Sequence, residues 1–271
     1  MIFLTLLYST FKEAFEKKIV LTIFLLITAV ILLFLSFINL DSIEGLKEML
    51  MMSGDESFRD AIVKFETNLI NQFSFMVVFS LLLIMSASFI PSILEKGNID
   101  LLLSKPLSRR KIVLGKFISV VFLAFIIILL LVSVIWFIIS IKTNVWHFPF
   151  LSAILWFTFI FAVMYSFELF IGLVSQSTIL SLLLTLFLLF PVTALLSARE
   201  TIVFSFVKND TIKFIFNFVF YLFPKPWDVR ESCINMIEGV AIQSWWHMIS
   251  SGIFMLVMLS VSVYYFSKKD Y

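Results

Sequence analysis

Charged residues are scarce in this sequence. Only 14% of its 271 residues are Asp, Glu, Lys or Arg, against about 25% in an average soluble domain. Hydrophobic residues make up 61%, and a soluble fold could not bury so many, because too little polar surface would remain to face water. The composition excludes an ordinary soluble domain and favours a helical membrane protein, whose apolar runs of about 20 residues cross the bilayer.

Cysteine and glycine are also rare, and several kinds of site are excluded as a result. The single Cys233 rules out an internal disulfide framework. Gly115-Lys116 lacks the earlier glycine and the following Ser or Thr that a phosphate-binding loop needs. His147 and His247 each follow a tryptophan at the edge of an apolar run, where amphipathic rings commonly rest at the membrane surface. We therefore expect no catalytic residue, no metal site and no bound cofactor. The net charge of +2 carries no information about nucleic acid, and no nucleic-acid partner is expected.

Six apolar runs are long enough to cross a hydrocarbon layer of about 30 Å. They cover residues 19–38, 71–90, 117–139, 150–174, 178–196 and 248–266. With six spans, the basic residues near 12–18, 96–116 and 268–269 fall on one side, and the acidic segment 39–70 falls on the other. The positive-inside rule then predicts a multi-pass protein of the cell (inner, cytoplasmic) membrane with both termini in the cytoplasm. The expected fold is a single all-α transmembrane domain over residues 1–271.

The first 18 residues have the pattern of an amphipathic helix rather than of a signal peptide. One face carries apolar side chains and the opposite face carries charged ones. The apolar set is Leu4, Leu7, Tyr8, Phe11 and Phe15, and the charged set is Lys12, Glu13, Glu16 and Lys17. Such a helix is expected to lie along the inner surface of the membrane, in the headgroup layer.

A second segment that does not span lies between the fifth and sixth runs. Residues 214–223 are strongly aromatic but reach only about 15 Å as a helix, which is too short to cross. Pro224 and Pro226 follow and are expected to end this helix. The segment is predicted to be either a re-entrant helix covered by the adjacent spans or an ordinary interfacial helix on the outer side.

Two residues inside the spans stand out. Glu168 lies about 9 Å along the helix from the cytoplasmic end of the fourth span, and a carboxylate at the centre of a span costs roughly 2.5–3.5 kcal/mol. An interior helix contact is favoured for it, and substrate binding or snorkelling to the surface are the alternatives. Pro191 interrupts the fifth span, which frees the carbonyl of Phe187 and kinks the helix. The kink is predicted to be either a hinge or a part of static packing.

The connection between the second and third spans, residues 91–117, is rich in Lys and Arg. Pro91 permits a new helical turn and Pro106 stops it, with an apolar patch and flanking charges between them. A short helix of this kind could dock into a groove on a partner protein or lie on lipid phosphates, and spacing alone favours neither.

The same connection resembles a motif of a known family. The pattern Glu95-x-Gly97-x-Ile99-x-x-Leu102-Leu103-x-x-Pro106-x-Ser108-Arg109, followed by Gly115-Lys116, resembles the first cytoplasmic loop of ABC-2-type permeases, the membrane subunits of ATP-binding-cassette exporters. The segment Leu222-Phe223-Pro224 and the chain length are similar to the permease branch associated with maturation of multicopper enzymes such as nitrous-oxide reductase.

This resemblance implies a function, partners and a set of site residues. Such permeases use a separate ATPase chain that binds ATP and Mg²⁺, and two permease subunits, identical or related, pair about a two-fold axis. Residues 92–110 would form a cytoplasmic coupling helix that contacts the ATPase through Glu95, Gly97, Ile99, Leu102, Leu103, Pro106 and Arg109. The chain is expected to be a permease subunit of an exporter and not an enzyme. The alternative is a non-transporting subunit that transmits force or a signal, or that supports maturation of an extracytoplasmic enzyme.

Overall fold

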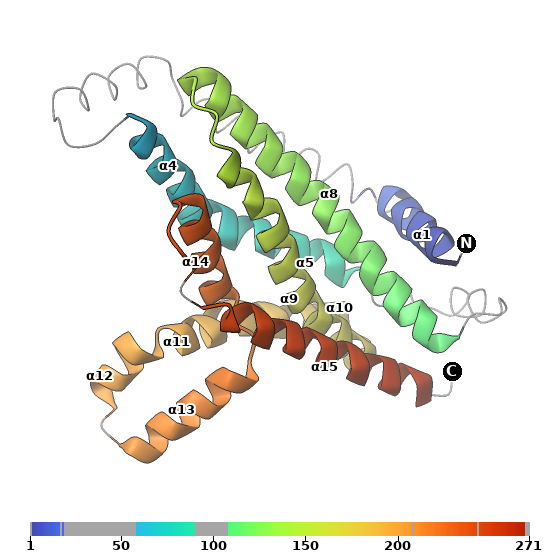
Figure 1. The fold of residues 1–271 in the computed structure, drawn as a ribbon. Helices are drawn as coiled ribbons and strands as arrows, with labels where there is room; N and C mark the ends of the chain where they lie inside the picture. Colours follow the sequence, from blue (N-terminus) through green and yellow to red (C-terminus); the bar gives the residue numbers. More distant parts are fainter. Residues whose placement is uncertain are drawn as a thin grey trace.

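The computed structural model of this chain describes residues 2–16, 18, 58–89, 108–207, 209–242 and 244–268. Within these residues every regular element is a helix, in agreement with the predicted all-α class (Figure 1). The first predicted span, 19–38, and residues 90–107 of the predicted coupling loop lie outside the described residues.

Five helical segments are long and apolar enough to cross a membrane in the part of the chain that the structure describes. The first of them joins α4 (Phe58–Asn68), the π-helical η1 (Leu69–Val78) and α5 (Phe79–Ala87), so it begins earlier than the predicted span at residue 71. The next are α8 (Arg109–Thr143) and the pair η2 (Phe148–Ser152) and α9 (Ala153–Ser175). The last two are α10 (Thr178–Phe187) with η3 (Leu188–Val192) and α11 (Thr193–Ser197), and α15 (Trp246–Lys268).

The longest element is α8, with 35 residues. At 1.5 Å per residue it extends about 52 Å, which exceeds the hydrocarbon thickness of about 30 Å, so at least one of its ends lies beyond the apolar layer. Its sequence has no proline to interrupt it. Asn144, in the left-handed conformation at φ 59°, ends the helix, a position that asparagine tolerates well.

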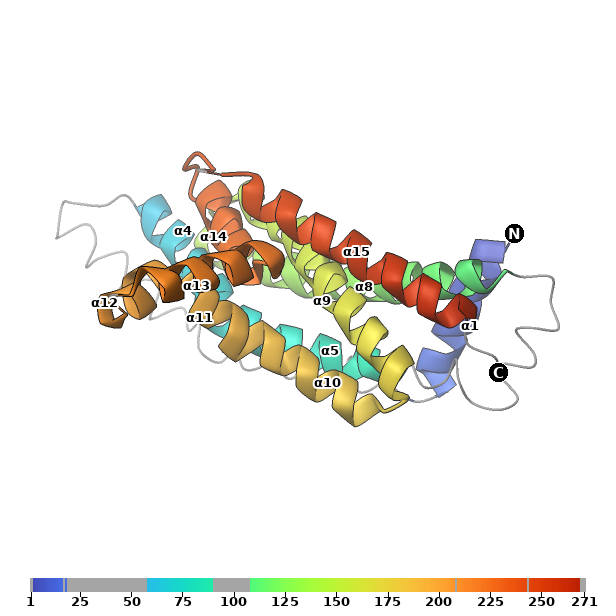
Figure 2. The same cartoon turned by 90° about the horizontal axis from the view of Figure 1, so that it is seen from below.

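The helix α9 lies at the centre of the bundle, in contact with α5, α8, α10, α14 and α15 (Figure 2). In its span 67% of the most apolar stretch is buried, against 33% for the spans of α10 and α15. Its fully buried side chains include Phe157, Phe161 and Tyr165. A side chain on the inner face of α9 is therefore surrounded by protein rather than by lipid, and this decides the environment of Glu168.

A tight turn reverses the chain between α9 and α10. Gln176 ends α9 in the left-handed region at φ 55°, and the Ser177 hydroxyl caps α10 by accepting a hydrogen bond from the Leu180 N–H. The two helices then pack against each other. Local backbone chemistry thus separates α9 from α10 at a boundary where no charged residue marks the end of a span.

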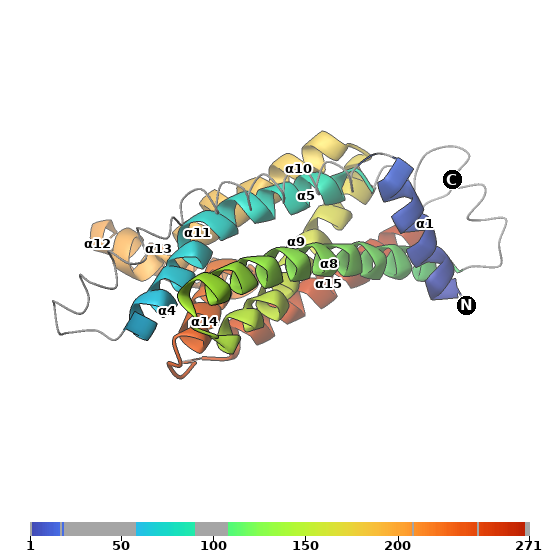
Figure 3. The same ribbon diagram turned by 90° about the horizontal axis from the view of Figure 1, so that it is seen from above.

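The N-terminal helix α1 (Ile2–Glu16) runs across the end of the bundle beside α8 (Figure 3). Thr10 and Ala14 are buried against the protein, whereas Tyr8 and Phe15 are 70% and 64% exposed. The face that packs on α8 is therefore rotated away from the centre of the apolar face that the sequence pattern picks out, and only Phe11 of the described apolar set contacts α8. The described residues leave Tyr8 and Phe15 uncovered.

Four further elements lie between α11 and α15. They are η4 (Arg199–Val203), α12 (Phe204–Phe206), α13 (Asp210–Leu222) and α14 (Pro226–Ile237), and α12 and α13 project away from the bundle (Figure 1). The aromatic segment 214–223 lies in α13, which ends before Pro224 as predicted. The sequence analysis does not anticipate α14. Pro226 opens this helix because the first helical position needs no N–H donor.

Candidate functional site

Glu168 is fully buried on α9 and lies against α5. Its Oε2 atom is 2.5 Å from the hydroxyl oxygen of Ser86, which is also fully buried. The Ser86 hydroxyl additionally lies 3.0 Å from the Leu83 carbonyl oxygen, and Oε1 of Glu168 has no hydrogen-bond partner among the described residues. The carboxyl group therefore makes an interior helix contact, as the burial of a polar group requires, and does not reach the surface.

This contact lies near the end of α5, shortly before the connection 90–107. Ser86 is the last residue but one of α5, and the chain turns directly after it, where the Phe89 N–H donates to the Ser86 carbonyl at 3.0 Å. Phe89 is fully buried and is the last described residue before the connection 90–107. The entry to the connection is thus tied to the central helix α9.

Lys116 on α8 lies at the other end of the same connection and contacts two other elements. Its Nζ atom is 2.6 Å from Oε2 of Glu13 on α1 and 5.3 Å from the ring centroid of Phe89. The Lys116 and Glu13 side chains are only 9% and 19% exposed, so the ion pair is shielded from solvent. Phe11 and Phe122 add a second contact between α1 and α8, with ring centroids 6.4 Å apart. Glu13, which the sequence pattern puts on the charged face of α1, therefore points to α8.

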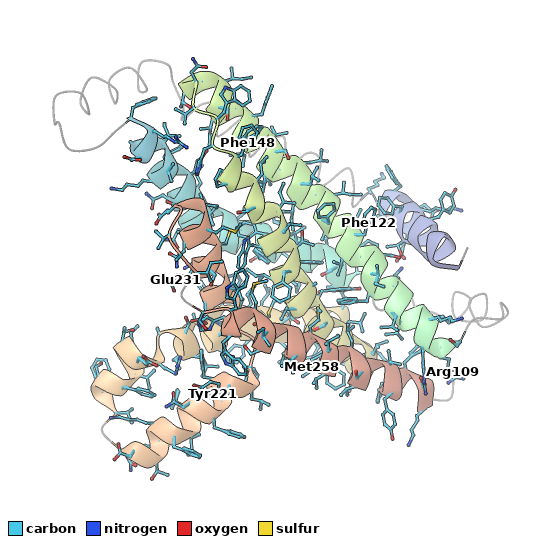
Figure 4. All side chains as sticks on the ribbon, in the orientation of Figure 1. Arg109, Phe122, Phe148, Tyr221, Glu231 and Met258 are labelled. Carbon is cyan, nitrogen blue, oxygen red and sulfur yellow. The ribbon has the colours of Figure 1, made fainter. Side chains whose placement is uncertain are left out.

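Most of the predicted coupling residues, namely Glu95, Gly97, Ile99, Leu102, Leu103 and Pro106, lie outside the described residues. Arg109 is described and begins α8, close to the C-terminal end of α15 (Figure 4). Arg110 and Lys111 follow it in the first helical turn. Three cations at a helix N-terminus face the positive end of the helix dipole, which is unfavourable in isolation. Anionic groups beside the start of α8 would offset this repulsion.

Pro191 lies in η3, where the helix widens into a π-bulge. The backbone N–H of Thr193 donates to the carbonyls of Leu188 and Phe190. The Leu189 carbonyl is therefore available to other donors. This carbonyl accepts the Thr193 hydroxyl at 2.6 Å and the indole N–H of Trp227 at 2.9 Å. The predicted kink is thus a bulge that is hydrogen-bonded to α14.

Two cations flank the ring of Phe220 near the start of α14. The Nζ atom of Lys225 lies 4.6 Å and the Cζ atom of Arg199 lies 3.5 Å from the ring centroid. Lys225 is 2% exposed and donates to the Ser250 hydroxyl of α15 at 2.9 Å. Burial lowers the pKa of Lys225 to about 8, while Asp228 acts to raise it and Arg199 to lower it. This cluster fastens α13 and α14 to α15.

A buried acid–histidine pair joins α4 to the turn before η2. Oε2 of Glu66 lies 2.6 Å from Nδ1 of His147, and their side chains are 0% and 6% exposed. Burial lowers the pKa of His147, and the positive charge of Arg59 lowers it further. The Trp136 indole N–H also donates to the His147 carbonyl at 3.0 Å. The interpretation of His147 as a ring resting at the membrane surface is therefore wrong.

In the described ranges no group of three or more His, Cys, Asp or Glu side chains could hold a metal ion. Cys233 is buried, and burial raises the pKa of its thiol to about 12, so it is not a reactive thiolate. The polar groups described above join helices to one another.

A protein-family model described as ABC-2 family transporter protein matches residues 9–271 of this chain. The chain belongs to the ABC-2 transporter family. No curated protein matches it. The resemblance carried by the pattern from Glu95 to Lys116 therefore identified the family correctly.

Membership of the ABC-2 family makes the chain an integral membrane component of a transport system, in agreement with its five described apolar segments. In this ABC-2 protein Phe89 precedes the connection 90–107, Lys116 follows it on α8, and the two side chains contact each other. The contacts of Glu66, Lys225 and Trp227 are what sequence reasoning missed. Each joins residues far apart in the chain, and no local pattern signals such a pair.

Proposed function

We propose that this ABC-2 protein is the permease subunit of an ATP-driven exporter and works as a dimer with separate ATPase subunits. ATP and Mg²⁺ bind to the ATPase, which agrees with the lack of a phosphate-binding loop in this sequence. Residues 92–110 form the cytoplasmic coupling helix that docks on the ATPase. Glu95, Leu102 and Arg109 are among its contact residues, as the family resemblance implies.

The observation that carries this proposal is the convergence of α1, the end of α5 and the start of α8 at Lys116. A partner that displaces residues 90–107 would act on α5 at Phe89 and on α8 below Lys116. The displacement would then reach the central helix α9, because Ser86 is bonded to Glu168. A partner can shift the equilibrium of the spans only if its contact with the connection differs between its own states, as docking to a hydrolysing ATPase provides.

The charge pattern supports a cytoplasmic position for this end of the bundle. Arg109, Arg110 and Lys111 would face anionic headgroups or acidic residues of the ATPase, either of which offsets their repulsion with the helix dipole. In the same arrangement α1 lies in the inner headgroup layer, with Tyr8 and Phe15 toward the hydrocarbon. The opposite end, with α13, then lies on the outer side, and the exposure of most of α13 supports an interfacial helix.

The exposed surface of α10 supports contact with lipid or with a second permease subunit. Ile179, Leu183 and Phe187 follow one another at four-residue spacing on α10 and are 71%, 58% and 60% exposed. Such a stripe is not covered by the described residues and suits an apolar environment. We assign part of this surface to the partner subunit, whether identical or related.

Co-purification with the cognate ATPase tests the proposal. Leu102→Asp or Glu95→Ala should abolish association with the ATPase while leaving membrane insertion intact, because each removes a docking contact. Arg109→Ala should act more mildly and serves as the comparison. Co-purification of both docking variants at wild-type levels would refute the docking role.

Export is tested separately from docking. Reconstituted complexes should turn over ATP in a way that depends on this subunit, and a deletion strain should accumulate the exported compound. Subunit-dependent turnover without any accumulated or transported compound would instead indicate a non-transporting role, such as support for an extracytoplasmic enzyme.

A further inference from the structure

The ammonium group of Lys116 contacts side chains from two separate parts of the chain. The residue is 7% exposed, and its ammonium group reaches Glu13 on α1 and the ring of Phe89 at the end of α5. These two partners lie on opposite sides of residues 19–57 in the chain, and Lys116 itself follows the connection 90–107. One side chain therefore joins the N-terminal helix to both described ends of the coupling connection.

The contacts of Lys116 with Glu13 and with Phe89 are made by the same ammonium group. A shielded cation needs compensation, and here the carboxylate of Glu13 and the face of Phe89 both supply it. If Phe89 moved with the connection, the ammonium group would lose part of its compensation or would follow the ring. Because the group is bound to Glu13, a move of either kind changes the position of α1.

The ion pair is not needed simply to attach α1. Phe11 already packs against Phe122 of α8, and Thr10 and Ala14 are buried on the same side. What the ion pair adds is the link to Phe89. A matched pair on α1 shows the contrast, because Lys12 and Glu16 lie 3.6 Å apart with side chains 63% and 65% exposed, where an ion pair has little effect.

We infer that Lys116 is a positioning residue for coupling, which makes α1 move together with the ends of the coupling connection. The inference rests on the proposed function, since the movement is driven by the ATPase. It adds a specific transmission route that runs from Phe89 through Lys116 to Glu13. The amphipathic helix α1 is then a moving part of the permease, displaced along the membrane surface when the connection is pushed.

Hydrogen–deuterium exchange of the full-length protein in lipid nanodiscs tests the link without the ATPase. Lys116→Met and Glu13→Gln should speed exchange in α1 and around Phe89 by about tenfold, whereas Lys12→Met should leave both regions unchanged. Lys116→Arg keeps a cation in place and should restore protection. Wild-type exchange of both regions in Lys116→Met and Glu13→Gln would overturn the inference.

ATP hydrolysis by the complex of this subunit with its cognate ATPase tests the role in coupling. Glu13→Gln and Lys116→Met should keep ATPase binding and the KM for ATP. The amount by which this subunit changes the maximal rate of ATP hydrolysis should fall about fivefold in each variant. Lys116→Arg should restore the rate, and Glu13→Gln combined with Lys116→Met should be no worse than either alone. Glu13→Gln is the milder change and carries the test if Lys116→Met fails to insert.

The two experiments separate the inference from the proposed function. If wild-type protein neither binds nor changes the ATPase, the proposed function fails, even where exchange shows the link between α1 and Phe89. If the wild-type protein changes the ATPase rate and Glu13→Gln does the same within about twofold, the positioning role of Lys116 fails while the proposed function stands.

Discussion

Trp227 donates its indole N–H to the carbonyl oxygen of Leu189 at 2.9 Å, and this bond joins the bulge around Pro191 to α14. The Cζ atom of Arg230 lies 4.7 Å from the centroid of the Trp227 ring. The same ring packs edge to face against Phe190. The bulge is therefore held from outside its own helix. Any hinge movement at Pro191 must carry α14 with it.

Trp227→Phe should lower the free energy of unfolding by about 1–2 kcal/mol, because one hydrogen bond is lost and a smaller aromatic ring replaces the indole. The Leu189 carbonyl would still accept the Thr193 hydroxyl, which limits the loss. Thermal unfolding of the purified protein in detergent measures the change. Trp246→Phe is the control, since Trp246 is 47% exposed, and it should change stability by less than about 0.5 kcal/mol. Equal stability of the two variants would show that the bond to Leu189 is not significant.

Ser86→Ala should destabilise the protein by about 1–3 kcal/mol, because it leaves the buried carboxyl group of Glu168 without its hydrogen bond. Glu168→Gln should be nearly neutral for stability, since a side-chain amide can either donate to the Ser86 hydroxyl or accept from it. Thermal unfolding again provides the measurement. Ser80→Ala, which removes an exposed hydroxyl bonded to the Met76 carbonyl, is the matched control. A loss for Glu168→Gln as large as that for Ser86→Ala would mean that the charge itself is required.

The helical segments and several of their ends follow from local sequence. Apolar runs predict the helices, Ser177 and Gln176 form the turn after α9 by their own backbone and side-chain chemistry, and Pro224 comes where α13 ends. These features depend on residues within a few positions of one another, so a sequence pattern can reveal them.

The pairs that hold the helices together do not follow from local sequence. Glu66 and His147 are 81 positions apart, and Lys116 and Glu13 are 103 apart. Periodicity on α1 gives the direction of its apolar face but cannot tell which face α8 will cover, because that depends on where α8 lies. The need of Glu168 for a protein partner was predictable from the cost of a buried carboxylate, whereas the identity of the partner, Ser86, was not.

Stability should depend on pH through Lys225. Its folded pKa of about 8 lies below the ordinary value of 10.5, so the unfolded chain binds more protons between these two values. Stability should therefore rise as the pH increases from about 8 to 10.5, with a full gain of about 3 kcal/mol, and the charged form should carry a constant penalty below pH 8. Thermal unfolding at pH 7.5 and at pH 10 measures the rise.

The contribution of Lys225 is isolated by comparing variants at each pH. Lys225→Met should lose the rise that the wild-type protein shows, whereas Lys12→Met should keep it, because the Lys12 side chain is 63% exposed. A rise of the same size in Lys225→Met would assign the pH dependence to other groups.

The Glu66–His147 pair should behave as one unit in a double-mutant cycle. Glu66→Ala and His147→Ala should each lower the free energy of unfolding by about 1–3 kcal/mol, because each leaves the other partner buried without its hydrogen bond. The double variant should be about 0.5–3 kcal/mol more stable than the sum of the two losses predicts. Glu200→Ala provides the contrast, since Glu200 pairs with Arg199 but is 71% exposed, and it should cost less than about 1 kcal/mol. Additive losses in the cycle would show that α4 and the turn before η2 are held together by other contacts, and that the short distance between Glu66 and His147 has no energetic role.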